Sequence, residues 1–310
     1  MLAPEETWKE LPEPPDYFHM PVFSYTVKNK VKGRNANPFI GGLENKHNRL
    51  VMSNPQGTVH TALYGWFPEN YDTSLAETMM NWCFGDYNTV CGASYLSEWG
   101  GVGNADTRRH MGLRVDTAVL KGSEDQPFLD LTIGLEGYNE TTFSTSQSLP
   151  NDMNNLVEFE WPDLKFYIGP DSNSLELMPI RALALQRQRG LQAYFMNSAH
   201  PTYLSASRDV TSLVVVPLKT DKTYDGYLRS LGETEKYGRI VCKGLHKDSN
   251  TGITGSTSYT EVTIDIPRIS LANKNDSDDS PDGHTFETLN WMCLKPDTSS
   301  HSIVLSYDYI

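Results

Sequence analysis

Cysteine and basic residues are both scarce in this chain of 310 residues. The cysteines show no paired short spacing, which argues against a disulfide framework and favours reduced, structural thiols in a cytosolic setting. They are Cys83, Cys91, Cys242 and Cys293. The 26 Lys and Arg residues are outnumbered by 39 Asp and Glu residues, giving a formal charge of -13. This excess argues against a protein that grips nucleic acid by neutralising phosphates. It permits a surface that nucleic acid slides past, and solubility alone also explains it.

Long apolar runs are missing as well. Residues 1–20 are polar and proline-rich, without the apolar segment of a signal peptide. No run approaches the roughly 20 apolar residues that a membrane-spanning helix needs. We therefore expect no membrane insertion.

The sequence also lacks motifs for catalysis, cofactors and metals. The eight histidines are scattered, and none has a second His or Cys at a metal-ligand spacing. There is no Gly-x-Ser-x-Gly elbow and no phosphate-binding loop that ends in Gly-Lys-Ser/Thr. An enzyme is not excluded, because catalytic residues gather in space and not in sequence. The absence favours a structural protein with no catalytic residue, metal or cofactor.

The patterns that are present predict a mainly β protein, and the stretch 208–271 is its clearest unit. It opens with a β-branched run, Val210–Val216, which Pro217 is expected to break. A short helix and two long strands should follow, at residues 224–231, 239–246 and 258–271. In the last strand Val262, Ile264 and Ile266 alternate with polar residues, which predicts one apolar face.

The first half of the chain predicts a similar order. A strand is expected at 57–66, followed by a helix that begins at Ser74, whose spacing to Glu77 forms a capping box. Gly85 is expected to end this helix in a left-handed conformation. Residues 86–107 are glycine-rich and predict a long loop, and a hairpin should follow at 112–121 and 128–137. Further strands are expected at 21–30, 157–168, 175–189, 284–294 and 302–309.

The shared order suggests a tandem arrangement. We expect an extended N-terminal arm at 1–20, a first β unit at 21–145 and a second β unit at 156–310. The polar residues 140–155 are the expected linker. Each unit should be a β-sandwich or barrel with one short flanking α-helix.

Several segments resemble the tail tube proteins of long-tailed bacteriophages. One is "SLAETMMNWCFGD" with the later "HMGLRVDTAVLKGSEDQPFLDLTIGLEGY"; another is "SASRDVTSLVVVPLKTDKTYDGYLRSLGE". The third is "TSYTEVTIDIPRISL", an acidic loop, and "DGHTFETLNWMCLKPDTSSHSIVLSYDY". The resemblance covers most of the chain after about Leu50. The resemblance does not extend to the N-terminal arm or to the 86–107 loop.

This resemblance implies a structural virion protein. Such subunits form hexameric rings, or trimeric pseudo-hexameric rings where the tube domain is duplicated, and the rings stack into a hollow tail tube. The implied partners are other copies of the chain, a tape-measure protein, and the tail terminator and distal tail proteins. Viral DNA would cross the lumen without specific binding during genome ejection. Assembly would take place in the host bacterial cytoplasm.

Within this hypothesis, acidic residues on the polar faces of long strands are candidates for the lumen, because they repel phosphates. They are Asp130, Glu136, Glu261 and Asp265. An ordinary solvated sheet face explains them equally well. Contacts between rings are expected from the proline-rich arm and the long loops. The candidates there are Pro12, Pro14, Pro15, Trp99, Asp276, Asp278 and Asp279.

Two other classes fit the composition. A jelly-roll viral capsid protein predicts eight strands per unit, few helices and closed shells. A carbohydrate-binding or hydrolytic β-sandwich predicts a concave aromatic cluster with paired carboxylates.

Overall fold

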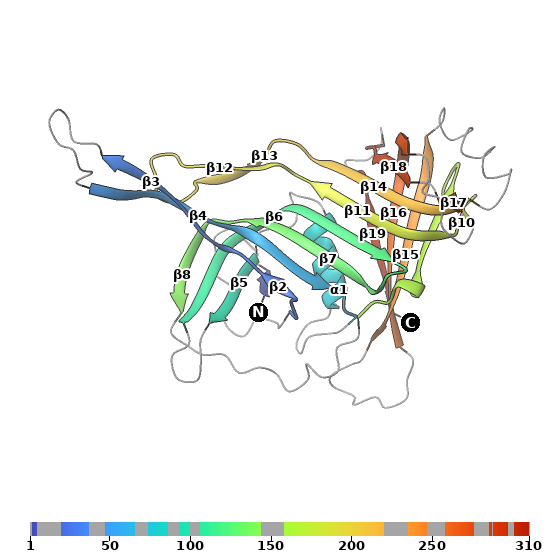
Figure 1. Ribbon diagram of the computed structural model, residues 1–310, viewed down its shortest axis with the longest axis horizontal. Helices are drawn as coiled ribbons and strands as arrows, with labels where there is room; N and C mark the ends of the chain where they lie inside the picture. The colour runs from blue at the N-terminus through green and yellow to red at the C-terminus, as the bar shows by residue number, and fades with distance from the viewer. Residues whose placement is uncertain are drawn as a thin grey trace.

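The chain folds into a mainly β structure with antiparallel pairing and one described α-helix, which confirms the predicted class (Figure 1). The computed structural model describes residues 2–4, 20–36, 47–65, 74–85, 93–99, 106–143, 158–219, 235–246, 258–275, 285–286, 288–296 and 301–309. The second expected helix, at 224–231, lies outside these residues.

The first half of the chain supplies the elements that carry the helix. In chain order they are β1 (Leu2–Pro4), β2 (Ser24–Tyr25), β3 (Lys28–Ala36), β4 (His47–Ala62), α1 (Leu75–Phe84), β5 (Ala93–Trp99), β6 (Asp106–Ser123), β7 (Gln126–Glu136) and β8 (Asn139–Phe143).

The second half begins with a 3-10 turn and continues in strands. In chain order they are η2 (Trp161–Asp163), β9 (Leu164–Gly169), β10 (Glu176–Met178), β11 (Ile180–Gln188), β12 (Leu191–Tyr194), β13 (Tyr203–Ala206), β14 (Val210–Lys219), β15 (Lys236–His246), β16 (Ser258–Asn275), β17 (Thr285–Phe286), β18 (Thr288–Cys293) and β19 (Val304–Tyr309).

Helix α1 begins as the sequence predicts. The Ser74 hydroxyl accepts a hydrogen bond from the Glu77 N–H at 3.1 Å, which satisfies one of the amides left open at a helix start. The predicted left-handed conformation of Gly85 is wrong, because this residue is extended, with φ -68° and ψ -180°. Two arginines of the second half donate to the carbonyls at this end of the helix, so it needs no left-handed turn.

A hydrogen-bonded ladder joins the two halves. In the first half β7 pairs with β4 on one edge and with β6 on the other. The opposite edge of β6 pairs with β11, from Thr117↔Gln188 to Ser123↔Ala182. From β11 the pairing continues through β14, β18, β16, β15 and β9. The backbone hydrogen bonding is therefore continuous across the expected boundary between the two β units.

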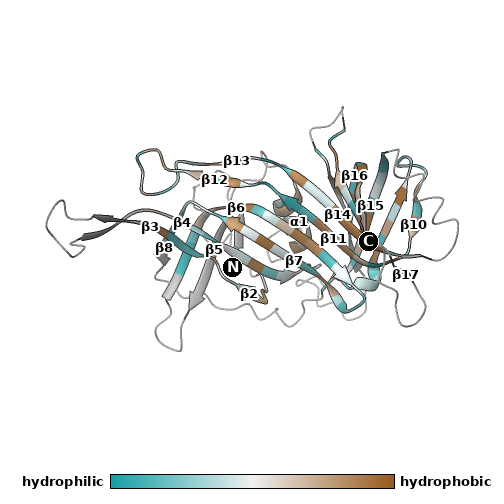
Figure 2. Ribbon diagram, turned by 45° about the horizontal axis from the view of Figure 1, so that its top comes forward, coloured by the Kyte–Doolittle hydropathy of each residue, from teal (hydrophilic) through white to brown (hydrophobic). Residues whose placement is uncertain are grey.

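The apolar faces of these strands enclose one core. Leu129, Leu131 and Ile133 of β7 are fully buried, as are Val262, Ile264 and Ile266 of β16, which confirms the apolar face predicted for the strand 258–271. Figure 2 shows hydrophobic and hydrophilic residues alternating along the long strands.

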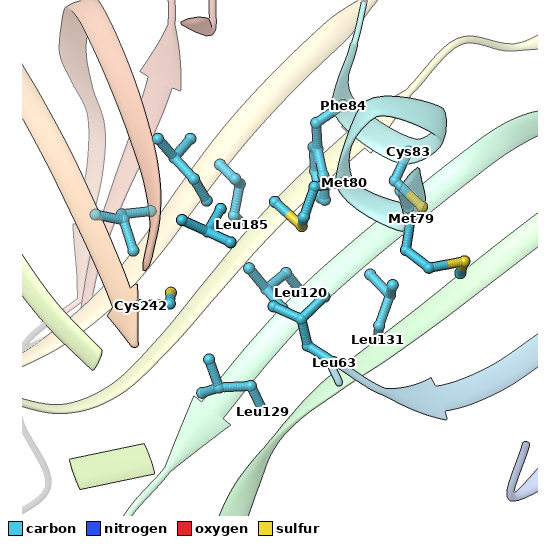
Figure 3. Close-up of a cluster of buried hydrophobic side chains, with 14 of the residues drawn as sticks. Leu63, Met79, Met80, Cys83, Phe84, Leu120, Leu129, Leu131, Leu185 and Cys242 are labelled. Carbon is cyan, nitrogen blue, oxygen red and sulfur yellow. The ribbon is translucent and has the colours of Figure 1, made fainter. Parts of the chain in front are cut away.

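Helix α1 covers this core. Met79, Met80 and Phe84 of the helix lie over leucines of the underlying strands (Figure 3). These leucines include Leu120 of β6 and Leu185 of β11, so the same cluster has members from both halves. The division into units 21–145 and 156–310 stays a prediction, and in the described residues neither the core nor the ladder is interrupted between them.

Three local predictions differ from the structure. Strand β14 runs through Pro217, which lies opposite Ile180 beside a β-bulge, a position where a ladder tolerates a residue without an N–H. The expected loop 86–107 contains β5, which pairs with both β1 and β6. The expected linker 140–155 begins inside β8, which pairs with β6.

The continuous core predicts a large cost for a cavity in β7. Leu131→Ala should lower the free energy of unfolding by about 2–5 kcal/mol, because the side chain is fully buried. Val31→Ala is the control, since Val31 is 43% exposed, and it should change the value by at most about 0.5 kcal/mol. Urea denaturation measures both. Equal effects would contradict the assignment of Leu131 to the core.

Candidate assembly surfaces

The outer face of β15 and β16 carries ion pairs in register. Lys243 lies opposite Glu261, with 2.7 Å between Nζ and Oε2, and Arg239 lies opposite Asp265, with 2.6 Å between Nε and Oδ1. The hydrogen bond to Asp265 raises the pKa of Arg239. Two of the predicted lumen residues therefore lie on an outer face as expected, but each has a cation beside it. The face is charge-balanced rather than acidic.

A cleft of about 430 Å³ lies on the same face. Lys165, Lys243 and Arg239 supply its cationic groups, while Glu261 is its only carboxylate and Tyr167 its only aromatic residue among the residues described. This lining provides neither paired carboxylates nor an aromatic cluster.

Asp130 has a different position from the other candidates. Its side chain is 2% exposed, with Oδ1 2.6 Å from His60 Nε2 and Oδ2 3.2 Å from Lys121 Nζ. Burying a carboxylate costs free energy, and close polar or cationic partners offset that cost. Asp130 is thus enclosed within the subunit, contrary to the expectation that it lines a channel.

Glu136 lies on β7 and is partly buried. Its Oε1 accepts hydrogen bonds from Gln56 Nε2 at 2.8 Å and from Asn54 Nδ2 at 3.1 Å, both on β4. Burial raises the pKa of Glu136, and Asp116 adds to the rise, while the two amide hydrogen bonds oppose it. Whether Glu136, Glu261 and Asp265 face a lumen stays a prediction, since it depends on an assembly of several copies.

Most of the expected contact residues between rings lie outside the described residues. These are Pro12, Pro14, Pro15, Asp276, Asp278 and Asp279. Trp99 is the last residue of β5 and is paired with Asp106 of β6.

A cluster of arginines that the sequence did not single out ties α1 to the second half. Arg187 donates from Nε and Nη2 to the two carboxylate oxygens of Asp209, each at 2.8 Å. It also donates to the carbonyls of Phe84 and Gly85, and Arg189 donates to Gly85 at 3.0 Å. Positive charge at this end of a helix is favourable, because the carbonyls there carry partial negative charge. Burial opposes ionisation of Asp209, but Arg187 outweighs it, and the pKa of Asp209 is lowered.

Beyond this cluster the β11–β14 ribbon continues as the β12–β13 hairpin. The chain turns at Gly190, whose φ of +60° and close approach to Ser207 favour glycine. The hairpin tip returns to the first half, where Ser53 N donates to Ala199 O at 2.8 Å. Tyr194 and Tyr203 stack with 4.8 Å between ring centroids and are both more than a third exposed. This tip therefore presents an aromatic surface.

Three thiols lie in the core. Cys83, Cys242 and Cys293 are free and buried, and burial raises the pKa of each to about 12. Cys91 lies outside the described residues. No described helix has the length and apolar content to span a bilayer. Within the described ranges, no three His, Cys, Asp or Glu side chains gather closely enough for a metal ion.

The raised pKa of Glu136 predicts a pH-dependent gain from Glu136→Gln. The pKa of Glu136 is raised in the folded state, so its protonated form is favoured by folding. Its contribution to the free energy of unfolding is therefore fully present below the pKa of the unfolded chain, about 4.3, and is lost as pH rises through the folded-state pKa. The substituted amide keeps an acceptor for Asn54 and Gln56 but cannot ionise. The variant should be more stable than the wild type at pH 7, and the difference should vanish below about pH 4. Urea midpoints at both pH values test this, with exposed Glu176→Gln as control. A Glu136→Gln variant that is less stable than the wild type at pH 7 would contradict the raised pKa of Glu136.

The arginine cluster predicts that Arg187→Lys is costly. Lysine cannot bind both Asp209 oxygens and the helix carbonyls at once, so unfolding free energy should fall by about 1–3 kcal/mol. Arg181→Lys, on the same strand, is the matched control. Arg181 pairs with Glu124 in a more exposed setting, and the change there should stay within about 0.5 kcal/mol. Equal losses in thermal and urea denaturation would show that the buried cluster does not tie α1 to β11.

Comparison with known proteins does not assign this chain to a family. A scan against protein-family models finds no match for the chain. A search of curated proteins also finds no match. Function must therefore be inferred from the residues and the fold of this chain.

Proposed function

We propose that this chain is a tail tube subunit of a long-tailed bacteriophage, a structural virion protein whose copies form rings that stack into a hollow tube. The observation that carries the proposal is the arrangement of the first half, in which a strand, a capped helix and a long hairpin form one unit with α1 over its apolar face. This is the order that the family resemblance implies. The tandem β-sandwich architecture of the tail tube type is part of the proposal.

The β6–β11 ladder supports a trimeric, pseudo-sixfold ring over a hexameric one. It joins a β unit of the first half side by side with strands of the second half, as neighbouring subunits would be joined in a ring. One chain would then occupy two of six equivalent positions, and three chains would close the ring. Pairing between copies would also cover sheet edges that are otherwise open to aggregation.

The outer sheet faces suit a channel that DNA crosses without being held. Tight binding to DNA requires Lys and Arg that neutralise phosphates. On the face of β15 and β16 the cations Lys243 and Arg239 are paired with Glu261 and Asp265, which reduces their attraction for phosphate. In this proposal Glu136, Glu261 and Asp265 face the lumen. A tape-measure protein would fill it during assembly, and the tail terminator and distal tail proteins would bind the tube ends.

The two other classes have less support. A jelly-roll capsid protein does not require a helix that packs into its core, whereas α1 has a side-chain cap at its start and contributes Met79, Met80 and Phe84 to the core. A hydrolytic or carbohydrate-binding sandwich needs paired carboxylates with aromatic residues, and the cleft beside β15 has one of each among the described residues.

Electron microscopy of the purified full chain in negative stain, over a range of concentrations, tests the proposal. Hollow tubes or stacked rings are expected because the tube is a homopolymer, and end-on views should show threefold symmetry. Closed shells would support the capsid class instead. A species that stays monomeric at every concentration, also after addition of a tail-tip complex as initiator, would contradict the proposal.

A further inference from the structure

The two ends of the long axis of the molecule carry opposite charge. At one end the β3–β4 hairpin extends away from the sheets, while β10 lies at the other end (Figure 1). We call residues 28–36 and 47–56 the basic hairpin, and residues 124–125 and 158–178 the acidic end. Both names follow from the charged residues in these segments.

The basic hairpin has no acidic residue in a chain that is strongly acidic as a whole. Of its basic residues, Lys28 and Lys30 are the two whose side chains the structure describes. Lys28, Lys30 and Val31 are exposed, so consecutive residues on both faces of β3 meet solvent. Lys28 and Lys30 lie on the same face of β3, so their like charges repel one another. Such a hairpin gains stability from an anionic surface that packs against it.

The acidic end supplies such a surface. Residues 158–178 contain five carboxylates and one lysine, and the β6–β7 turn adds two more carboxylates. Bridges from Phe128 to Glu160 and from Glu176 to Ile168 hold these segments together. The exposed members are Glu124, Asp125, Glu160, Asp163, Asp171 and Glu176.

Each surface also has an exposed apolar residue among its charges. Val31 of the hairpin is 43% exposed, and Leu177 of β10 is 55% exposed. Interfaces commonly combine an apolar centre with a polar rim, and complementary charges raise the association rate and fix orientation. Both requirements are met between the two ends of this chain.

We propose that the basic hairpin of one copy docks on the acidic end of a second copy. The contact is head to tail, since it joins two different surfaces, and it therefore repeats without limit unless the rotation closes it into a ring. It names the contact that would join subunits of the proposed tube, and in that sense it rests on the proposed function. The self-docking itself is measured separately from the shape of the polymer.

Charge reversal at each end, followed by mixing, tests the contact. The hairpin variant is K28E/K30E and the acidic-end variant is D163K/E176K, all four at exposed positions. Each variant alone places like charges at the contact. A one-to-one mixture restores opposite charges at both kinds of contact, because the Glu-bearing hairpin meets the Lys-bearing end and the unmodified surfaces meet each other. The control R208E/K236E changes net charge as much as the hairpin variant does, outside both surfaces.

Sedimentation velocity over a range of concentrations, at low and high salt, measures the outcome. The wild type and the control should self-associate, more weakly at high salt. Each end variant alone should need at least about tenfold higher concentration, and the mixture should recover wild-type behaviour. The proposal is overturned if either variant alone associates like the wild type, if the mixture does not recover, or if the wild type remains a monomer.

The shape of the polymers separates this inference from the proposed function. Hollow tubes that form equally well with the end variants would leave the tube function standing and remove the hairpin contact. Recovery in the mixture with assemblies that are not hollow would support the contact and contradict the tube.

Discussion

The ladder between β6 and β11 is the constraint on which the rest of the structure depends. β6 uses one edge for β7 and the other for β11, so it is a central strand shared by two halves that are far apart in sequence. Because successive side chains of a strand point to opposite faces, this register places Leu120 and Leu185 on one apolar face. Helix α1 packs on that face, and the Arg187 hydrogen bonds then hold the end of the helix against the second half.

The strand pairing also determines where charged side chains meet. On the sheet faces, acidic residues lie opposite or beside cations, as for Glu261 with Lys243 and Asp130 with Lys121. Acidic residues outnumber basic ones in the segment around η2, while Lys28 and Lys30 are exposed on β3 at the other end of the long axis (Figure 1). A subunit with charge-balanced sheet faces and ends of opposite charge is suited to end-to-end association. Its sheet faces would bind DNA only weakly.

Sequence periodicity predicted much of this fold but only part of its surfaces. Alternation found the buried face of β16, and the Ser74 and Glu77 spacing found the start of α1, because both depend on neighbours in sequence. The burial of Asp130 was not predictable, since its partner His60 comes from another strand whose register the sequence does not specify. The role of Arg187 was missed for the same reason: Phe84 and Asp209 are distant in the chain. The sequence likewise contained no information about the polar partners that lie beside Asp130 and Glu136.

The two halves are expected to unfold as one cooperative unit, because the β6–β11 ladder joins them. Native-state hydrogen exchange measures it directly, by following the amides of residues 117–123 and 182–188 together with those of β7 and β16. In a single cooperative unit these amides exchange only through global unfolding, with one shared free energy and one denaturant dependence. Ladder amides that exchange at much lower free energy, with β7 and β16 opening independently, would show two separate domains and contradict it.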